Sequence, residues 1–401
     1  MTSQLAPQFA DRTKRLRSSA IRDLLKLTEN SDILSMAGGL PSPEAFPLVD
    51  LRREADRLLS EFGPAVVQYS ATDGVPDLRR WLASRYSDEF NREVAVDGQI
   101  LVTHGSQQAL DLLAKIFINP GDIVVSEAPA YLGAIQSLEL FEPRFEAIPG
   151  DEHGMKVEIL AERLAQGLRP KLVYVVPNFH NPSGATLSLE RRKLLAELAD
   201  RYELNVIEDD PYGAIRFAGA PLPPVASFSD RVIYLSTFSK VVAPGFRVGW
   251  MIGPNPVIAM AIRAKQAADL HTSTFAQQLL SNLVSRPGWI DDQQKRIVPI
   301  YRDRCKALAD AFDETFGQER ITFHRPEGGM FLWTTIPEVA DTTKLLEAGV
   351  ANGVAFVPGN AFSIDQAPDS YARFSYATLN PDQLRTGANR LHAALEGLCH
   401  G

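Results

Sequence analysis

The sequence predicts an α/β protein, in which a large domain has a mostly parallel sheet covered by helices and a smaller α+β domain follows it. Two observations predict this fold class. Between residues 100 and 253, short apolar segments of strand type alternate with helical segments, a pattern typical of parallel sheets with helices on both faces. The length of 401 residues also exceeds what one hydrophobic core normally supports, so we expect two domains.

The composition is that of an ordinary globular protein and argues against several functional classes. Hydrophobic residues make up 45% and charged residues 22%, and the net charge of -8 argues against non-specific nucleic-acid binding. The chain starts with a polar segment and has no apolar run long enough to cross a bilayer, so we expect no secretory signal and no membrane partner. Cys305 and Cys399 are too few for a disulfide framework, which predicts a reducing, cytoplasmic location.

The first hundred residues are predicted to be mainly helical. Helical patterns cover residues 13–27, 49–62 and 77–86. Between the first two lies the turn-rich segment 37–43. Its pair Gly38-Gly39 would let the backbone approach a ligand closely, although a plain loop explains the pair equally well.

The alternating region places a set of polar residues at one edge of the predicted sheet. Strands are expected at 100–103, 123–125, 172–176, 205–208, 232–235 and 248–252, with helices at 109–117 and 189–202. In such sheets the ligand site forms at the carboxyl ends of the strands. The polar residues that follow the strands are Ser106, Gln107, Tyr131, Asn181, Asp209, Tyr212 and Lys240.

The region after Pro254 has a different pattern and is predicted to form the smaller α+β domain. Two long helical patterns run to about Phe316, and a hairpin-like segment follows at 321–333. A helix near 342–352, strands at 355–357 and 373–376 and a last helix complete it.

Lys240 is the strongest candidate for a reactive residue. It lies in Ser236-Thr237-Phe238-Ser239-Lys240, directly after a strand, and Arg247 follows seven residues later. A lysine withdrawn from water loses its proton more readily and becomes a nucleophile towards carbonyls, which is Schiff-base chemistry. A surface lysine on a loop is the alternative. The two hydroxyls and the arginine, which could hold an anion beside the amine, favour the reactive role.

The other candidates each have a plainer explanation. Ser106 begins a helix, whose free N–H groups favour a phosphate, but it could simply cap that helix. Asp209 could hold a ring-nitrogen cation or be an ordinary loop acid. Asn181-Pro182-Ser183-Gly184 is a turn by composition. Arg373 either lies on a solvated face of its strand or gives two parallel hydrogen bonds to a carboxylate. His104, His180 and His271 lack metal-ligand spacing, so we expect no metal.

Four motifs occur in a fixed order along the chain. They are Asn181-Pro182-Ser183-Gly184, Asp209-Asp210-Pro211-Tyr212, Ser236-Thr237-Phe238-Ser239-Lys240 with Arg247, and Arg373-Phe374-Ser375-Tyr376. Together they resemble the pyridoxal-phosphate (PLP) aminotransferases of fold type I, from about Ser18 to the last helix. Residues 35–41, 68–70, 105–111, 127–131 and 268–272 are similar to the branch that contains the 2-aminoadipate aminotransferases of lysine biosynthesis and the kynurenine/aminoadipate aminotransferases.

This resemblance implies a domain organisation and a cofactor site. The large PLP-binding domain, with a seven-stranded type of sheet, would span 48–295, and the small domain would combine 296–401 with the N-terminal segment 1–47 at the mouth of the active site. Lys240 would hold PLP as a Schiff base and then move the proton between substrate and cofactor carbons. Asp209 would keep the ring nitrogen protonated, and Tyr131 would stack on the ring.

The resemblance also implies the remaining contacts. Asn181 and Tyr212 would hydrogen-bond the phenolic oxygen of the ring, and Arg373 would grip the substrate carboxylate, with Gly39 and Asn181 beside it. Tyr69 would reach the phosphate in the neighbouring subunit of a homodimer with shared active sites. The residues implied to hold the phosphate within one subunit are Ser106, Gln107, Thr237, Ser239 and Arg247.

The implied reaction is a ping-pong transfer of an amino group between an L-amino acid and a 2-oxo acid. Arg22 matches the position at which the aminoadipate branch binds the distal carboxylate of acidic substrates, so we expect 2-aminoadipate or glutamate with 2-oxoglutarate. A solvent-facing Arg22 is the alternative, in which case aromatic or branched-chain amino acids become the main substrates.

Two other classes use a similar domain. A PLP-dependent lyase could share the fold, because one fold hosts many chemistries. A transcription regulator could carry this domain for effector sensing. Since fewer than twenty residues precede the resemblance, we do not expect the DNA-binding domain that such a regulator would need.

Overall fold

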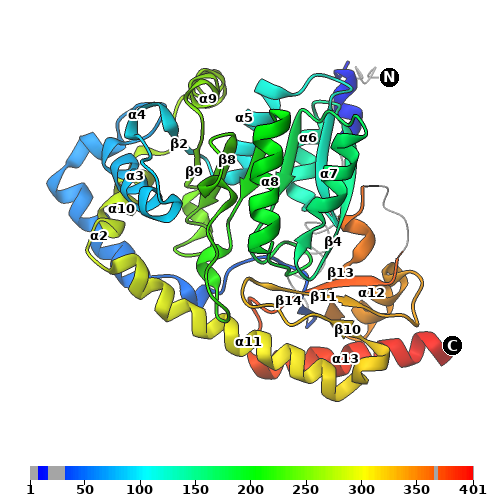
Figure 1. Cartoon of the computed structure of the whole chain (residues 1–401). Helices are drawn as coiled ribbons and strands as arrows, with labels where there is room; N and C mark the ends of the chain where they lie inside the picture. Colours follow the sequence, from blue (N-terminus) through cyan, green and yellow to red (C-terminus); the bar gives the residue numbers. More distant parts are fainter. Residues whose placement is uncertain (1–7, 17–31, 365–368, 401) are drawn as a thin grey trace, which may run out of the picture.

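The computed structural model describes residues 8–16, 32–364 and 369–400. A central eight-stranded sheet with helices around it forms the larger part, and a four-stranded sheet lies below it in Figure 1. The strands are β1 (Leu34–Ser35), β2 (Ile100–Thr103), β3 (Ile123–Ala128), β4 (Arg144–Asp151), β5 (Gly154–Met155), β6 (Leu172–Val175), β7 (Val206–Asp209), β8 (Val232–Thr237), β9 (Gly249–Ile252), β10 (Thr322–Phe323), β11 (Phe331–Thr335), β12 (Val354–Ala355), β13 (Val357–Pro358) and β14 (Tyr371–Ser375).

The helices of the described ranges are mostly amphipathic and cover these sheets. They are α2 (Leu48–Glu61), α3 (Pro76–Phe90), α4 (Val96–Gln99), α5 (Ser106–Phe117), α6 (Leu132–Glu139), α7 (Val157–Ala165), α8 (Leu189–Tyr202), α9 (Asn255–Ala268), α10 (Thr274–Val284), α11 (Trp289–Arg320), α12 (Thr342–Ala351) and α13 (Pro381–His400). Helices α7 and α8 pack side by side on one face of the large sheet, and α5 packs with α6 and α9 on the other (Figure 1).

The large sheet confirms the predicted mostly parallel α/β fold. Its strand order is β2-β9-β8-β7-β6-β3-β4-β5. Only β9 and the two-residue β5 run antiparallel to their neighbours. The strand β5 makes the sheet eight-stranded where seven strands were implied. Every residue of β2, β6, β7, β8 and β9 is buried, because helices cover both faces and leave no solvated side.

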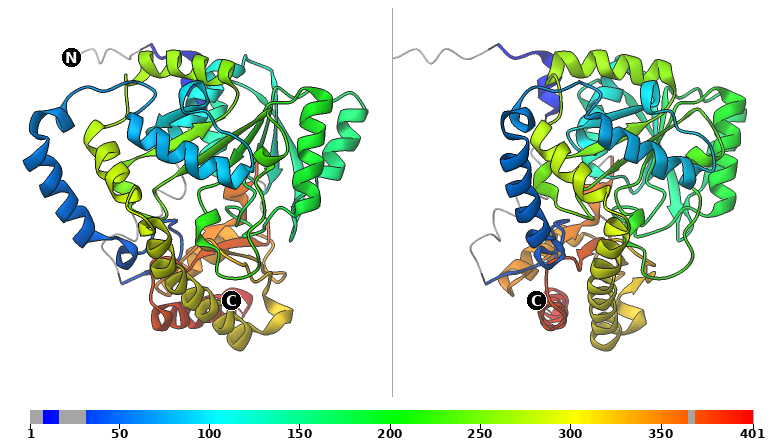
Figure 2. Two further views of the ribbon diagram at one scale, coloured as in Figure 1. Left: turned by 60° about the vertical axis from the view of Figure 1, so that its left-hand side comes forward. Right: turned by 90° about the vertical axis from the view of Figure 1, so that its left-hand side faces the viewer.

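The small sheet combines segments that lie far apart in the sequence. Its order is β10-β11-β14-β13, and all of its neighbouring strands are antiparallel. Helix α11 runs from the helices beside the large sheet to the underside of the small one, where it packs on α13 (Figures 1 and 2). The N-terminal β1 pairs with β12. Residues near 35 therefore lie against the C-terminal part of the chain.

Several predicted boundaries differ from the structure. Instead of two long helices after Pro254, there are three, because the chain breaks between α9 and α10 at Leu270, which has a positive φ of 68°. Helix α5 begins at Ser106 rather than at Ala109. The helix expected over 13–27 lies mostly in the range 17–31, which is outside the described residues. Before it, Asp11–Arg15 form a 3-10 helix. Within the described ranges no helix is long and apolar enough to cross a membrane.

Candidate active site

A cavity of about 150 Å³ lies at the carboxyl ends of the parallel strands, where the sequence predicts a ligand site. The register pairs Asp209 of β7 with Leu235 of β8, so the turn that carries Lys240 starts beside Asp209. The cavity is lined by Ser106, Gln107, Leu110, Tyr131, Val176, Asn181, Asp209, Pro211, Tyr212, Thr237, Ser239, Lys240, Pro244 and Arg247.

Lys240 presents its amine to this cavity. Its Nζ donates a hydrogen bond to the carbonyl oxygen of Gly39 at 2.9 Å and lies 5.8 Å from the centre of the Tyr212 ring. Burial, together with the nearby charges of Arg247 and Arg373, lowers the pKa of Lys240 to about 8. A substantial fraction of this amine is therefore neutral near physiological pH and can act as a nucleophile or a base.

One corner of the cavity is built to receive an anion. The Arg247 guanidinium lies 3.4 Å from Ser239 Oγ and has no acidic partner within the described ranges. Ser239 and Thr237 share a hydrogen bond of 2.9 Å between their hydroxyls. Helix α5 starts at the same corner, where its free N–H groups favour negative charge. Gly105 precedes it with a φ of +74°, and a Cβ there would lie 2.5 Å from Arg247 Nη2.

The start of α5 also decides between the two explanations of Ser106. Gly105 is the N-cap and no side chain caps the helix, so capping by Ser106 is wrong. Ser106 lies close enough to Asp209 to lower its pKa, yet Ser106 Oγ and Asp209 Oδ1 meet no partner at hydrogen-bonding geometry. Buried polar atoms without partners are costly, and a ligand in the cavity would satisfy both.

Asp209 is a buried carboxylate placed to hold a cation. Its Oδ2 accepts a hydrogen bond from the Tyr174 hydroxyl at 2.9 Å. Burial and then the charge of Asp210 raise the pKa of Asp209 to about 7, whereas the hydrogen bond from Tyr174 and the nearby Ser106 hydroxyl lower it. A cation beside the free oxygen would reverse this shift, because an opposite charge stabilises the ionised form.

Arg373 comes from the small sheet and reaches the cavity through Asn181, which lines it. It lies on β14 and is 1% exposed, so a solvated face is excluded. Its Nη1 donates to Asn181 Oδ1 at 2.7 Å and its Nη2 to the Ala37 carbonyl at 2.5 Å. Within the described ranges no carboxylate pairs with it and its Nε has no partner. Burial lowers the pKa of Arg373 to about 10, so it stays charged at neutral pH and can receive an external carboxylate.

The structure places three predicted residues differently from the rest. Gln107 lines the cavity, but its side-chain Nε2 donates to the Gly133 carbonyl and to Ser137 Oγ, which leaves its backbone N–H as the donor for a ligand. Tyr69 is 77% exposed and packs edge-on against His271 instead of lining the cavity. Arg22 lies outside the described residues.

Sequence reasoning missed the residues that support the charged groups. Tyr174 fixes Asp209, and its one signal is a tyrosine within an otherwise aliphatic buried strand. The rings of Phe331 and Phe362 lie 4.3 and 4.8 Å from the Arg373 guanidinium carbon. These aromatic rings come from the small sheet and the segment beside it, and no local pattern connects them with Arg373.

These features fit pyridoxal phosphate, and together with the fold they define the class of PLP-dependent enzymes of fold type I. The residues offer an amine for the aldehyde, an anion corner for the phosphate and a carboxylate for the ring nitrogen. The family model for aminotransferase class I and II matches residues 39–391. An aromatic-amino-acid aminotransferase of Thermococcus litoralis is 41% identical over 393 residues, 96% of this chain and 93% of that relative.

Solved structures agree. The kynurenine aminotransferase of Pyrococcus horikoshii in complex with PMP is 40% identical, with a TM-score of 0.92 and 97% of each chain covered. The α-aminoadipate aminotransferase of Thermus thermophilus, complexed with N-(5'-phosphopyridoxyl)-L-leucine, is 36% identical, with a TM-score of 0.90 and 98% of each chain covered. The chain belongs to the class I and II aminotransferases. It is a PLP-dependent enzyme whose substrates are amino acids and 2-oxo acids.

Proposed function

We propose that this aminotransferase moves the amino group of an acidic L-amino acid, 2-aminoadipate or glutamate, to 2-oxoglutarate or a related 2-oxo acid by a ping-pong mechanism. The observation that carries the first half of this proposal is Arg373, a buried and charged guanidinium without an acidic partner among the described residues. It supports a site for the α-carboxylate that every amino acid and 2-oxo acid shares.

The roles of the cavity residues follow from their chemistry. When bound, PLP supplies an electron sink for the breaking bond at the substrate α-carbon. Lys240, with its lowered pKa, would accept the proton from that carbon and serve as its donor later in the reaction. Asp209 would hold the positive ring nitrogen, and Asn181 with Tyr212 would hold the phenolic oxygen. Tyr131 would cover the ring.

The phosphate is assigned to the anion corner. Ser106, Thr237, Ser239 and Arg247 bring hydroxyls and a guanidinium to the start of α5. Gln107 contributes through its backbone N–H, since its side-chain amide is engaged elsewhere. Gly39, whose carbonyl accepts from Lys240, lies beside the substrate.

The preference for an acidic substrate rests on Arg22 and on the likeness to the Thermus thermophilus α-aminoadipate aminotransferase. The experiment compares 2-aminoadipate, glutamate, phenylalanine and leucine as donors to 2-oxoglutarate, in the wild type and in Arg22→Ala. We expect loss of one charge-assisted hydrogen bond to lower kcat/KM for the two acidic donors by about tenfold or more and to spare the apolar ones. Arg12→Ala, at an exposed position nearby in the sequence, is the control. Equal losses for both classes would remove Arg22 from this role.

An aromatic-amino-acid aminotransferase is the second candidate. It is favoured by the Thermococcus litoralis relative, which carries that name. Phenylalanine or kynurenine as the best donor, with no effect of Arg22→Ala on the ranking, would select this candidate.

We also propose that the enzyme acts as a homodimer with shared active sites. Tyr69 is exposed, and so are several apolar side chains of α2 and the following turn, which supports this assembly: Leu48, Val49, Leu59, Phe62 and Val67. We divide the chain into a large PLP domain at 48–295 and a small domain at 296–401 with residues 1–47. Helix α11 passes through this boundary. A cytoplasmic location and a part in lysine biosynthesis stay predictions.

A further inference from the structure

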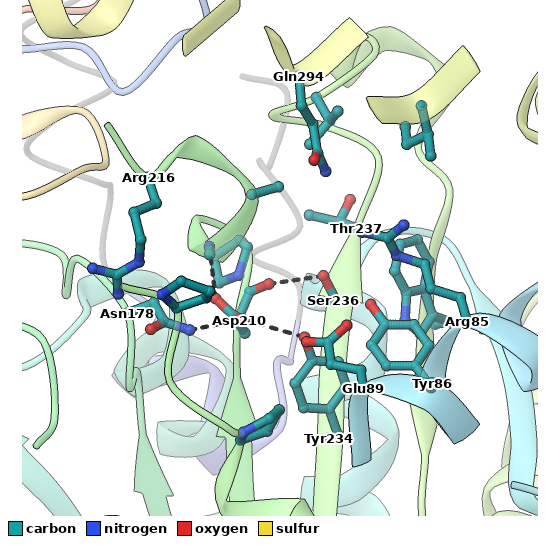
Figure 3. A pocket seen from close by; sticks show the side chains of 18 of the residues that line it. Arg85, Tyr86, Glu89, Asn178, Asp210, Arg216, Tyr234, Ser236, Thr237 and Gln294 are labelled. Atoms are coloured by element: carbon teal, nitrogen blue, oxygen red, sulfur yellow. Dashed lines mark hydrogen bonds between the residues drawn. The ribbon is translucent and has the colours of Figure 1, made fainter. Parts of the chain in front are cut away.

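A second cavity lies behind the active site. It has a volume of about 420 Å³, within the range of roughly 300–1,000 Å³ that small-molecule sites occupy. Helix α3, the turn after β8, the segment 210–224 and the first turns of α11 surround it. Figure 3 shows this cavity from close by.

The two cavities share a wall. Pro211 and Thr237 line both of them. Asp209 faces the Lys240 cavity while its neighbour Asp210 faces the second one, because successive side chains at the end of a strand point to opposite faces. An occupant of the second cavity would therefore lie directly behind the residues assigned to the cofactor.

Two groups of opposite charge, Arg85 and Glu89, face the second cavity, and they are close enough for the Arg85 charge to lower the pKa of Glu89. Arg85 and Glu89, one turn apart on α3, and Gln294 of α11 make no hydrogen bond or ion pair within the described part of the chain. Arg85 only rests on Trp81, with its guanidinium carbon 5.6 Å from the centre of that ring. Arg85 and Gln294 are half-buried, and Glu89 is exposed. These three groups therefore offer contacts to a ligand.

Arg85 and Glu89 point towards different parts of this cavity, and a second lining arginine, Arg216, lies beside Asn178 (Figure 3) and pairs with Glu327 at 2.8 Å. In Figure 3 the Arg85 guanidinium lies on the side of Thr237, and the Glu89 carboxyl on the side of Asp210 and Tyr234. Asp210 is nearly buried and accepts hydrogen bonds from Asn178 Nδ2 at 2.9 Å and from the Tyr234 hydroxyl at 3.2 Å. Partial withdrawal from water and then the Asp210 charge raise the pKa of Glu89, whereas the Arg85 charge one turn away lowers it. A cation placed between these two carboxyl groups would stabilise the ionised form of both.

Several of the other lining residues are apolar or aromatic, beside the polar Asn178, Arg216, Ser236 and Thr237. Trp81, Phe238 and Trp250 come from three different elements, and Pro221, Leu222, Pro223 and Pro224 close one side. Such walls favour a flat or branched hydrocarbon body, and aromatic faces also attract ammonium groups.

We propose that this cavity is a second small-molecule site, which binds a zwitterionic amino acid with a large apolar side chain. The ammonium group lies between Glu89 and Asp210, the carboxylate is held by Arg85 and Gln294, and the side chain packs against Trp81 and Phe238. The site is separate from the catalytic one and gives the enzyme a place to sense an amino acid without transaminating it.

The test measures binding to the aminated holoenzyme, which has no amino acceptor and does not react with added amino acid. Calorimetry compares L-phenylalanine with phenethylamine, which lacks the carboxylate, and with 3-phenylpropionate, which lacks the ammonium group. The variants are Arg85→Gln and Glu89→Gln. Arg80→Gln and Asp88→Asn are matched controls, because these residues are exposed on the same helix and do not line the cavity. Thermal melting verifies that each variant is folded.

We expect L-phenylalanine to bind more tightly than either half-molecule. Arg85→Gln and Glu89→Gln should each weaken its binding about tenfold, the loss of one charge-assisted contact, and the controls should not. Arg85→Gln should leave phenethylamine unaffected, and Glu89→Gln should leave 3-phenylpropionate unaffected. Unchanged binding in both variants, or no saturable binding to the wild type at about 10 mM, would overturn the site. Equal affinity for phenethylamine and phenylalanine would overturn the zwitterion assignment.

Discussion

Replacing Arg373 by lysine tests whether the substrate carboxylate is held by a fixed planar guanidinium. The hydrogen bonds to Asn181 and Ala37, at 2.7 and 2.5 Å, set the plane of this group, and Phe331 and Phe362 lie 4.3 and 4.8 Å from its central carbon. A guanidinium held in this way can give a carboxylate two parallel bonds. Lysine keeps the positive charge but cannot give a carboxylate two parallel hydrogen bonds from one planar group.

The expected loss follows from one missing charge-assisted hydrogen bond, which is worth about 1.5–3 kcal/mol. This corresponds to a fall in kcat/KM of about ten- to a hundredfold. Since the pKa of Arg373 is about 10, the wild-type group is charged at neutral pH. The assay follows the cofactor absorbance in single-turnover reactions with glutamate, phenylalanine and leucine. The loss should be the same for all three, because they share the α-carboxylate.

Arg304→Lys is the matched control. Arg304 is also buried, donates to the Ala377 carbonyl and pairs with Glu44 at 3.3 Å, but neither partner lines the cavity, whereas Asn181, the partner of Arg373, does. This variant should lose stability without a comparable loss in kcat/KM. A loss confined to one amino acid, or the same loss in both variants, would refute the role of Arg373.

Three further predictions concern the cofactor. Lys240→Ala should abolish multiple turnover, and borohydride should no longer fix the cofactor to the protein; steady turnover by this variant would contradict the assignment. The affinity of the cofactor-free protein for PLP should fall as the pH drops below about 7, because Asp209, with its pKa of about 7, must then lose a proton before it can hold a cation. Asp209→Asn should bind PLP more weakly at high pH and lose this part of the pH dependence, as measured by fluorescence titration; an unchanged profile would exclude Asp209. Arg247→Lys should weaken PLP binding about tenfold without changing the ranking of amino-acid donors, and a changed ranking would count against a phosphate role.

Elements with strong local signals could be predicted from the sequence. Helix α8 has the predicted bounds 189–202, because Ser188 caps it through the Arg191 N–H and its apolar residues recur at helical spacing. The buried strands β2, β7 and β8 were found because continuous apolar runs stand between turns. The break before α10 was missed. Leu270 adopts a positive φ there without the glycine that usually marks such a position.

The part of the site that lies at the ends of the parallel strands could be predicted from the sequence. Asn181, Asp209, Tyr212 and Lys240 follow parallel strands and line one cavity, as the edge rule requires. Contacts between sheets could not be predicted in this way. Arg373 reaches Asn181 from another sheet, across 192 positions of sequence, and Tyr174 reaches Asp209 from a neighbouring strand. Such pairs depend on how complete elements pack.

The buried charges of the cavity carry a cost in the cofactor-free protein. Arg373 is buried without an acidic partner in the described ranges, Asp209 keeps one oxygen without a hydrogen bond, and the pKa of Lys240 is lowered by burial. Unpaired buried charge destabilises a fold, so packing alone does not account for these residues. A ligand with an aldehyde, a ring cation and a neighbouring carboxylate complements all three. Binding of cofactor and substrate therefore removes this cost. The charged groups are already in position before either ligand arrives.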